Sequence, residues 1–482
     1  MSTSASSTTS TKAGTNGKVI ALAIAGALGG FLFGFDSSVV NGAVEPIREQ
    51  FGLTETLTGL AVASALIGCA VGAYLAGRLA DSKGRIPSML VGAVLFFVSA
   101  IGCGFAFGVW DLILWRLVGG LGIGIASVIA PAYIAEISPK NLRGRLGSLQ
   151  QLAITLGIFA ALLSDTLFAG AANGAEKELW WGIEAWRWMF LAGVVPAVIY
   201  GLVSMRLPES PRFLILKNRD NDVRDIFARY WPGEDAERAI RDMRSVIKTD
   251  ELGSRKGALR GNRFGLKPIV WVGIILSILQ QFVGINVIFY YSTTLWKSVG
   301  FAESDSLAIS VATSITNIAV TFVAIALVDR VGRRPILLFG SVGMTVALAT
   351  MAVAFSQAAL VNNEPRLEGA WGPIALVAAN IFVVSFGASW GPVVWVLLGE
   401  IFPTTIRARA LGIAAAAQWI ANFLITVSFP PLASVSLVLT YGMYALFAGL
   451  SFLFVFKVVP ETNGMSLEEA ETLFVRARKP AK

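Results

Sequence analysis

The chain has 482 residues, of which 55% are hydrophobic and only 15% are charged, and its net charge is +8. Soluble domains carry about 25% charged residues, so this composition argues against a soluble fold and predicts a membrane protein. Histidine is absent. Because histidine is the side chain that usually titrates between about pH 5 and 8, any proton chemistry must depend on carboxylates.

Apolar runs long enough to cross a bilayer occur six times in each half of the chain. They fall near residues 18–42, 58–78, 86–108, 110–137, 146–170, 185–207, 268–296, 305–328, 335–356, 373–400, 408–434 and 437–459. We therefore expect an all-α protein with twelve transmembrane helices. The first run is too long for a removable signal peptide. The Ser/Thr-rich stretch 1–17 before it is predicted to be disordered.

Basic residues are concentrated on alternate connections between these runs. The segment 208–266 holds 13 basic and 10 acidic residues, and short connections on the same side add further lysines and arginines. By the positive-inside rule, both termini and this segment are predicted to be cytoplasmic in a multi-pass protein of the cell membrane. The positive charge is thus a topology signal, and no nucleic-acid partner is expected, since that would need a basic face without this alternation.

The segment 208–266 separates a predicted six-helix bundle, 18–207, from a second one, 267–459, which a tail at 460–482 follows. Its windows 219–230 and 234–248 have apolar residues at helical spacing. They predict a small cytoplasmic helical subdomain, with a solvated charged linker as the alternative.

Three motifs occur twice in the same order. Asp81-Ser-Lys-Gly-Arg85 recurs as Asp329-Arg-Val-Gly-Arg333 at an offset of 248, and Pro208-Glu209 recurs as Pro460-Glu461 at an offset of 252. The stretch that ends near Glu136 is echoed 264 residues later near Glu400. Offsets this similar indicate two related halves.

These motifs fall at predicted cytoplasmic helix ends, where groups from both halves could meet. Arginine and carboxylate side chains form geometrically specific, often bidentate pairs. Two such sets would form a latch that is closed when the outside is open and separated when the inside is open; the alternative is charge that only sets topology. The members of this gate are Arg85, Glu136, Arg143, Glu209, Arg212, Arg333, Glu400, Arg407 and Glu461.

One carboxylate, Asp36, lies well inside the first apolar run. A charge at the centre of a membrane helix costs about 2.5–3.5 kcal/mol, so Asp36 needs a partner or a proton. Arg116, in the fourth run, is the counter-charge at a matching depth. Burial and a nearby arginine act in opposite directions on the pKa of an aspartate, so the pair is a candidate for proton coupling. A permanent structural salt bridge is the alternative.

Neutral amides form a third group within the apolar runs. An amide can both donate to and accept from a hydroxyl without burying a charge, and an indole adds a flat apolar face, so the set suits a neutral polyhydroxylated ring. Each amide could instead only link helices. The group comprises Gln151, Gln280, Gln281, Asn286, Asn317, Gln418 and Asn422, with the indole of Trp395.

Cofactor and metal chemistry is not expected. Cys69 and Cys103 both lie in apolar runs, where a small hydrophobic role is favoured over a disulfide or a metal site. No G-x-x-x-x-G-K-[ST] motif occurs. Because that loop is what cradles the phosphates of a nucleotide, transport would have to use gradients. We expect no enzyme activity.

Taken together, the motifs resemble those of the sugar porter family of the major facilitator superfamily, and are most similar to bacterial glucose permeases that act as proton symporters. The matching elements are Gly34-Phe-Asp36-Ser, Arg116-Leu-Val-Gly-Gly, Pro131-Ala-Tyr-Ile-Ala-Glu136, Pro208-Glu-Ser-Pro-Arg212, Gln280-Gln-Phe-Val-Gly-Ile-Asn286, Asp329-Arg-Val-Gly-Arg-Arg334, Trp395-Val-Leu-Leu-Gly-Glu400 and Pro460-Glu-Thr462.

The resemblance implies two pseudo-symmetric six-helix bundles that rock around a central site, with broken seventh and tenth helices as gates. It implies that the amides and Trp395 hold the sugar, that Asp36 and Arg116 couple it to a proton, and that Phe33, Tyr290 and Tyr291 shape the exit. A monomer is expected for the family.

The function predicted from these residues is proton-driven import of glucose or a close hexose, with the sugar, the proton and the lipid bilayer as partners. Apolar Ile158 favours hexose over pentose, because some xylose-binding relatives have an amide at that position. A sugar uniporter or a proton-coupled carrier of inositol or another polyol fits the same residues. A sensor that binds sugar without transport is the alternative from a different class, and the short tail disfavours it.

Overall fold

The computed structural model describes residues 5–138, 143–232, 235–256, 259, 265–361, 364–402 and 406–462, apart from some side chains within these ranges. Most of this part is helical, and twelve helical segments are long and apolar enough to cross a membrane. The predicted number of membrane-spanning helices is confirmed.

The first half contains six spans and one short antiparallel hairpin. Helices α6 and α7 together make the sixth span. The elements are α1 (Ala5–Phe51), α2 (Glu55–Lys83), α3 (Arg85–Gly104), α4 (Val109–Ile137), α5 (Arg143–Ala172), β1 (Glu178–Trp180), β2 (Ile183–Glu184), α6 (Ala185–Ala192) and α7 (Val194–Ser204).

Glycines let the helices of this half approach closely. A Cβ at Gly68 of α2 would lie 2.3 Å from the carbonyl oxygen of Leu117, and one at Gly120 of α4 would lie 1.9 Å from that of Ala65. Small residues four apart are the usual means of close helix packing in lipid. The backbones of α2 and α4 therefore touch along a seam that no larger residue would allow.

The second half repeats this plan with two interrupted spans. The seventh span bends at Gly284, whose φ of 83° favours glycine, and the tenth is interrupted around Ser389. The breaks implied for these two helices are confirmed. The elements are α11 (Pro268–Phe282), α12 (Ile285–Tyr290), α13 (Ser292–Ser298), α14 (Glu303–Val331), α15 (Arg333–Ser356), β3 (Ala359–Val361), β4 (Glu364–Arg366), α16 (Trp371–Gly387), α17 (Trp390–Ile401), α18 (Arg407–Val435) and α19 (Leu437–Val458).

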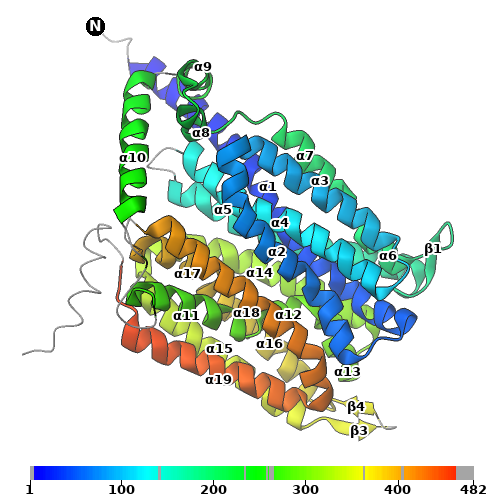
Figure 1. The fold of residues 1–482 in the computed structure, drawn as a ribbon. Helices are drawn as coiled ribbons and strands as arrows, with labels where there is room; N and C mark the ends of the chain where they lie inside the picture. Colours follow the sequence, from blue (N-terminus) through cyan, green and yellow to red (C-terminus); the bar gives the residue numbers. More distant parts are fainter. Residues whose placement is uncertain are drawn as a thin grey trace, which may run out of the picture.

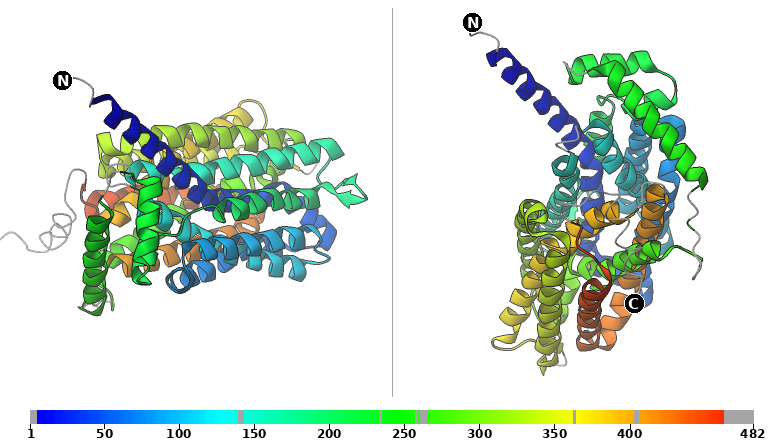
Figure 2. Two further views of the ribbon diagram at one scale, coloured as in Figure 1. Left: turned by 90° about the horizontal axis from the view of Figure 1, so that it is seen from above. Right: turned by 90° about the vertical axis from the view of Figure 1, so that its left-hand side faces the viewer.

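Figure 1 shows the membrane-spanning helices running side by side, with the linker helices α8 (Pro211–Leu216), α9 (Asp220–Tyr230) and α10 (Ala236–Lys256) at one end and the two β-hairpins at the other. We call these the linker end and the far end. The two halves pack together mainly through α2 against α18 and α5 against α14. Figure 2 shows the first turns of α1 projecting from the linker end.

Both windows of the linker that are predicted to be amphipathic helices are helical, as α9 and α10. Val223 and Phe227 of α9 are buried, and so is Ile240 of α10, while ion pairs join Arg224 to Glu237 and Arg244 to Asp220. An apolar face inside and charges outside are what the helical spacing predicts.

The beginning of the chain differs from its prediction. Helix α1 starts at Ala5, so the backbone is helical over most of the stretch 1–17 that the composition suggests to be disordered. A helix is costly to nucleate and cheap to extend. The apolar span that follows supplies the nucleus, and the polar residues extend it.

Candidate functional site

Three parts of the first half meet at the linker end around Arg85. The Arg85 guanidinium donates to both carboxylate oxygens of Glu136, at 3.0 Å and 2.8 Å. Glu209 accepts the backbone N–H groups of Arg85 and Ile86, the first turn of α3, at 2.9 Å and 3.2 Å. The Ser210 hydroxyl also donates to Glu136. A carboxylate at a helix N-terminus satisfies free N–H groups and the helix dipole.

The second half builds the same arrangement around Arg333. Its guanidinium donates to both oxygens of Glu400, with the shortest distance 2.9 Å. Glu461 accepts the backbone N–H groups of Arg333 and Arg334, both at 3.0 Å, and the Thr462 hydroxyl donates to Glu400 at 2.6 Å. We call the groups around Arg85 and Arg333 the two charge sets.

The glycines before the two arginines explain why each motif contains Gly-Arg. Gly84 has φ of 103° and Gly332 has φ of 99°. A Cβ would lie 2.4 Å from a carboxylate oxygen of Glu209 at the first position and 2.8 Å from one of Glu461 at the second. Both the backbone conformation and the close carboxylate therefore require glycine.

The recorded ion pairs of each charge set stay within one half of the chain. The contact between carboxylates and guanidiniums of the two halves that the sequence predicts therefore stays a prediction. Each carboxylate is held by a neighbour on its own half because the repeat carries all partners together. Arg212 is half-buried at the start of α8. The side chains of Arg143 and Arg407 lie outside the described residues.

Asp36 and Arg116 face one another deep inside the first half. Asp36 Oδ1 lies 3.8 Å from Arg116 Nη1, and their side chains are only 10% and 3% exposed. Arg116 Nη2 donates to the carbonyl oxygen of Val62, and the guanidinium lies over the ring of Phe190. Arg116 Nε and Nη1 have no hydrogen-bond partner in the described part of the chain. The pair is in contact but incompletely bonded.

The predicted amides form short hydrogen-bonded chains in the second half. Gln280 donates to the carbonyl oxygen of Trp390 at 2.7 Å and accepts from Gln418 at 2.8 Å. Gln418 Oε1 has no partner among the described residues. Asn286 donates to Gln281 at 2.6 Å, beside the break in the seventh span. These amides are fixed in orientation.

The other predicted sugar residues are less directly connected. Asn422 is buried in α18 and accepts from Thr426. A Cβ at Gly387 would lie 3.1 Å from Asn317, so this amide faces α16. Trp395 of α17 is 42% exposed. Gln151 is half-buried in α5.

Phe33 makes an aromatic contact across the two halves. Its ring meets that of Trp419 edge to face, with centroids 5.3 Å apart. Phe33 is on α1 of the first half and Trp419 is on α18 of the second. Sequence reasoning missed Trp419, although it directly follows Gln418 in the chain.

Asn41 of α1 connects the halves toward the far end. Its amide donates to Thr293 Oγ1 at 2.9 Å and to Ser310 Oγ at 3.4 Å, and its carbonyl accepts the Thr293 backbone N–H at 3.0 Å. Nearby, the Ala175 backbone N–H donates to Glu303 at 3.0 Å. Polar contacts therefore join the two halves at this end. Asn41 was missed, although it is an amide in the same apolar run as Asp36.

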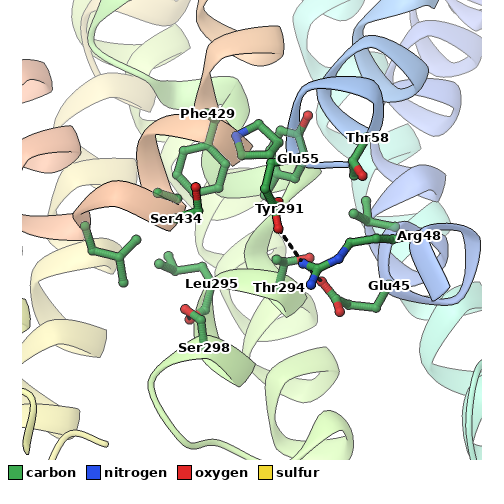
Figure 3. A pocket seen from close by; sticks show the side chains of 14 residues that line it. Glu45, Arg48, Glu55, Thr58, Tyr291, Thr294, Leu295, Ser298, Phe429 and Ser434 are labelled. Carbon is green, nitrogen blue, oxygen red and sulfur yellow. Dashed lines mark hydrogen bonds and ion pairs between the residues drawn. The ribbon is translucent and has the colours of Figure 1, made fainter. Parts of the chain in front are cut away.

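A cavity of about 120 Å³ lies at the far end between the halves (Figure 3). Its walls include Arg48, which pairs with Glu55 at 3.2 Å, and Tyr291, whose hydroxyl donates to the Thr426 carbonyl oxygen. Tyr290 is also buried, and its hydroxyl has no hydrogen-bond partner in the described part of the structure. Along α1, the Asn41 contacts lie nearer the middle of the span than Arg48 does.

Two halves of six spans, interrupted seventh and tenth helices and a repeated charge set define a carrier of the major facilitator type. The chain matches the family described as "Sugar (and other) transporter" over residues 22–474. The protein belongs to this family of sugar porters. Like its relatives, it is a transporter and no enzyme.

Among its relatives, a glucose transport protein of Synechocystis is 53% identical over 92% of this chain and 95% of its own. A D-xylose-proton symporter of Escherichia coli K12 is 34% identical, with 95% and 96% covered. The glucose transporter GlcP of Staphylococcus epidermidis is 36% identical, with 93% and 95% covered.

Solved structures of the xylose transporter XylE are also similar. XylE bound to 6-bromo-6-deoxy-D-glucose matches with a TM-score of 0.78 at 33% identity, covering 95% of this chain and 99% of that one. A partially occluded inward-open conformation of XylE from E. coli gives 0.80 at 32% identity, covering 93% and 100%.

Proposed function

We propose that the protein imports glucose or a closely related hexose together with protons, by alternating access of a central site to the two sides of the cell membrane. The names of the relatives support the substrate class. Two are glucose transporters, one is a D-xylose-proton symporter, and one XylE structure holds a glucose derivative.

The buried pair of Asp36 and Arg116 carries the proposal of proton coupling. At 3.8 Å, with two guanidinium nitrogens unpartnered, the pair is held by charge more than by hydrogen bonds. A proton on Asp36 removes the attraction, and its release restores it. Asn41 and Phe33 also lie on α1, and both contact the second half. Movement of α1 away from α4 would therefore disturb these two contacts.

Sugar binding is assigned to the amides of the second half. Gln280 and Gln418 are held in place by one another and by the Trp390 carbonyl oxygen, which leaves Gln418 Oε1 as a fixed acceptor. A fixed acceptor suits a sugar hydroxyl, because little ordering remains to be done when the ligand binds. The other members of the site are Gln151, Gln281, Asn286, Asn317, Asn422, Trp395 and Phe33.

Gating is assigned to residues at the two opposite ends of the molecule. At the far end, Asn41 and the packed tyrosines Tyr290 and Tyr291 close the path. At the linker end, the two charge sets would tie the helix ends of each half into a rigid rim. The far end faces outside in this proposal, since the basic connections put the linker and both termini in the cytoplasm. The protein would act as a monomer.

Uptake of labelled glucose into liposomes, with and without an inward proton gradient, tests this function. Accumulation above equilibrium that needs the gradient and is lost in Asp36→Asn supports symport. Glucose that only equilibrates, equally in wild type and variant, makes the protein a uniporter and leaves Asp36 as a structural partner of Arg116.

A further inference from the structure

Large aromatic side chains are exposed on two connections of the far end. Trp180 and Trp181 belong to the hairpin β1–β2 and are 50% and 88% exposed. Phe107 and Trp110 lie between α3 and the first turn of α4 and are 87% and 69% exposed. We call these four side chains the aromatic patch. Exposed apolar groups that gather in one region mark an interaction surface.

The two connections are held next to one another. Arg187, which follows β2 by three residues, donates from its guanidinium to the carbonyl oxygens of Gly104 and Ala106 at the end of α3, at 3.2 Å and 2.6 Å. Figure 1 shows the hairpin at the outer edge of the far end, beside α6. The aromatic patch is therefore at the periphery of the first half and not at its contact with the second.

Trp181 has a backbone conformation that suits it poorly. Its φ is 55°, and that of the next residue, Gly182, is 70°. Two successive positive φ values are typical of a type I′ hairpin turn, in which Asn, Asp and Gly are preferred. The left-handed conformation costs roughly 1–2 kcal/mol in other residues. Trp181 packs against Trp188 with ring centroids 5.5 Å apart but stays mostly exposed, so burial within the protein does little to offset this cost.

The aromatic patch continues the surface that two spans turn away from the bundle. On α5, Leu163 and Leu167 are exposed, and the neighbouring Phe168 contacts Trp180 edge to face, with centroids 6.1 Å apart. Exposed apolar residues recur on α3 at a spacing of three or four, which places them on one face of the helix. They are Val91, Val94, Val98, Ile101 and Phe105, and this face ends two residues before Phe107.

Charged residues precede the hairpin tryptophans. Glu176, Lys177 and Glu178 are all exposed. Tryptophan between an apolar face and charged residues is typical of the level of lipid headgroups, because the indole combines an apolar body with a polar N–H group. A sugar or a second copy of the chain would not need apolar faces of α3 and α5 that lead into the patch, whereas a bilayer does.

We propose that the hairpin β1–β2 and the α3–α4 connection lie in the headgroup region of the membrane leaflet at the far end, where phospholipid covers the aromatic patch. The hairpin is then a lipid anchor of the first half, and the contact with lipid offsets the backbone cost at Trp181. This inference goes beyond the proposed function and does not depend on it, since neither the sugar nor the proton takes part.

A spin label on the hairpin tests the inference in the full chain, reconstituted in liposomes of phosphatidylcholine and phosphatidylglycerol. Cys69 and Cys103 are buried, so the label reacts with the thiol that Trp181→Cys introduces. Its collisions with oxygen, which partitions into lipid, are compared with its collisions with a water-soluble nickel chelate. Val198→Cys, exposed on the sixth span, gives the ratio for lipid, and Lys177→Cys gives the ratio for water. The ratio of oxygen to nickel collisions for Trp181→Cys is expected to lie clearly above that for Lys177→Cys.

Three results would overturn the inference. The first is a ratio for Trp181→Cys no higher than that for Lys177→Cys. The second is a label that nickel reaches until glucose shields it, which would make the patch a sugar platform, and the third is spin–spin broadening, which would make it a contact between two copies. Should Trp181→Cys fail to fold, Phe107→Cys decides: a ratio above that for Lys177→Cys supports the anchor, and an equal ratio contradicts it. Glucose uptake is measured separately, so failure here leaves the proposed function standing.

Discussion

The two halves of the molecule share their linker ends and differ in the middle of their spans. The charge sets are the same: an arginine, a glutamate that binds it, and a second glutamate on the helix N-terminus. In the middle, Gly34-Phe-Asp36 corresponds to Gly284-Ile-Asn286 at an offset of 250, and the offset of 264 that relates the two charge sets pairs Arg116 with Asn380. The two positions of the charged pair hold amides in the other half, where Asn286 donates to Gln281 and Asn380 to the Leu376 carbonyl oxygen.

The offset of 250 also pairs Gly34 with Gly284, and the backbone conformation differs between these two positions. Helix α1 runs unbroken past Gly34, where the α5 backbone packs against it. The seventh span breaks at Gly284, where φ is 83° and a Cβ would touch Tyr444. Gly34 allows α1 and α5 to pack closely, whereas Gly284 allows the seventh span to bend. The comparison suggests that the first half handles the proton and that the second holds the sugar and moves locally.

Breaking the charged pair on one side should have the largest effect. Arg116→Asn leaves Asp36 buried without its counter-charge, which typically costs about 3–5 kcal/mol. The free energy of unfolding in detergent measures this loss. Adding Asp36→Asn places amides at both positions, as in the second half, and should recover most of the stability without proton coupling. A double variant as unstable as Arg116→Asn would contradict the comparison.

The charge sets offer a test of equivalence. Glu136→Ala and Glu400→Ala each remove the carboxylate that accepts hydrogen bonds from an arginine. Hydrogen bonds to charged groups contribute about 1.5–3 kcal/mol to the free energy of unfolding. Glu136 is 12% exposed and Glu400 is 25% exposed, so the first variant should lose slightly more. Unfolding and glucose uptake, measured on both, check this. A large loss from one and none from the other would mean that the sets are not equivalent.

The amides should affect sugar more than stability. Gln280→Ala removes the hydrogen bonds that join Gln280 to the Trp390 carbonyl oxygen and to Gln418, so Gln418 is no longer held in place. Losing one neutral hydrogen bond to the sugar would cost about 1 kcal/mol. The KM for glucose uptake should rise by about five- to tenfold, with little change in proton dependence. Asn380→Ala is the matched control, because among the described residues that amide donates to the Leu376 carbonyl oxygen of its own helix. An equal rise in KM for both would remove the special role of Gln280.

The linker should give the smallest effect. Arg244 pairs with Asp220 at 2.7 Å on an exposed surface, and exposed pairs contribute about 0–1 kcal/mol. Arg244→Ala should leave both uptake and the free energy of unfolding nearly unchanged. A strong loss of transport would show that α9 and α10 take part in gating.

The spans could be predicted because lipid makes their signal local, and the repeat could be predicted because three motifs recur in the same order. Every backbone group in a bilayer must be bonded within the helix, so apolar length alone marks a span. That the seventh and tenth helices are broken followed from the family resemblance, and the position at Gly284 came from the structure. The residues of the charge sets could be predicted, but their pairing could not. Sequence spacing does not tell whether Glu136 binds an arginine of its own half or of the other half.

Contacts between the halves could not be predicted from spacing. Asn41 reaches Thr293 across 252 residues of chain, and Phe33 reaches Trp419 across 386. Asp165 is a different case, because an acidic residue inside an apolar run is a signal that the sequence does contain. That its Oδ1 lacks a hydrogen-bond partner among the described residues is visible only once α1 and α5 are placed against one another.

Thermodynamic coupling tests the central claim most directly. Liposomes that contain the protein are held at a pH difference of one unit, acidic outside, and the steady-state ratio of glucose inside to outside is measured. One proton per glucose makes the limiting ratio about ten, since one pH unit is worth about 1.4 kcal/mol and a tenfold change in ratio. The account predicts a ratio well above one that approaches this limit and falls to one in Asp36→Asn. A wild-type ratio of one would contradict it.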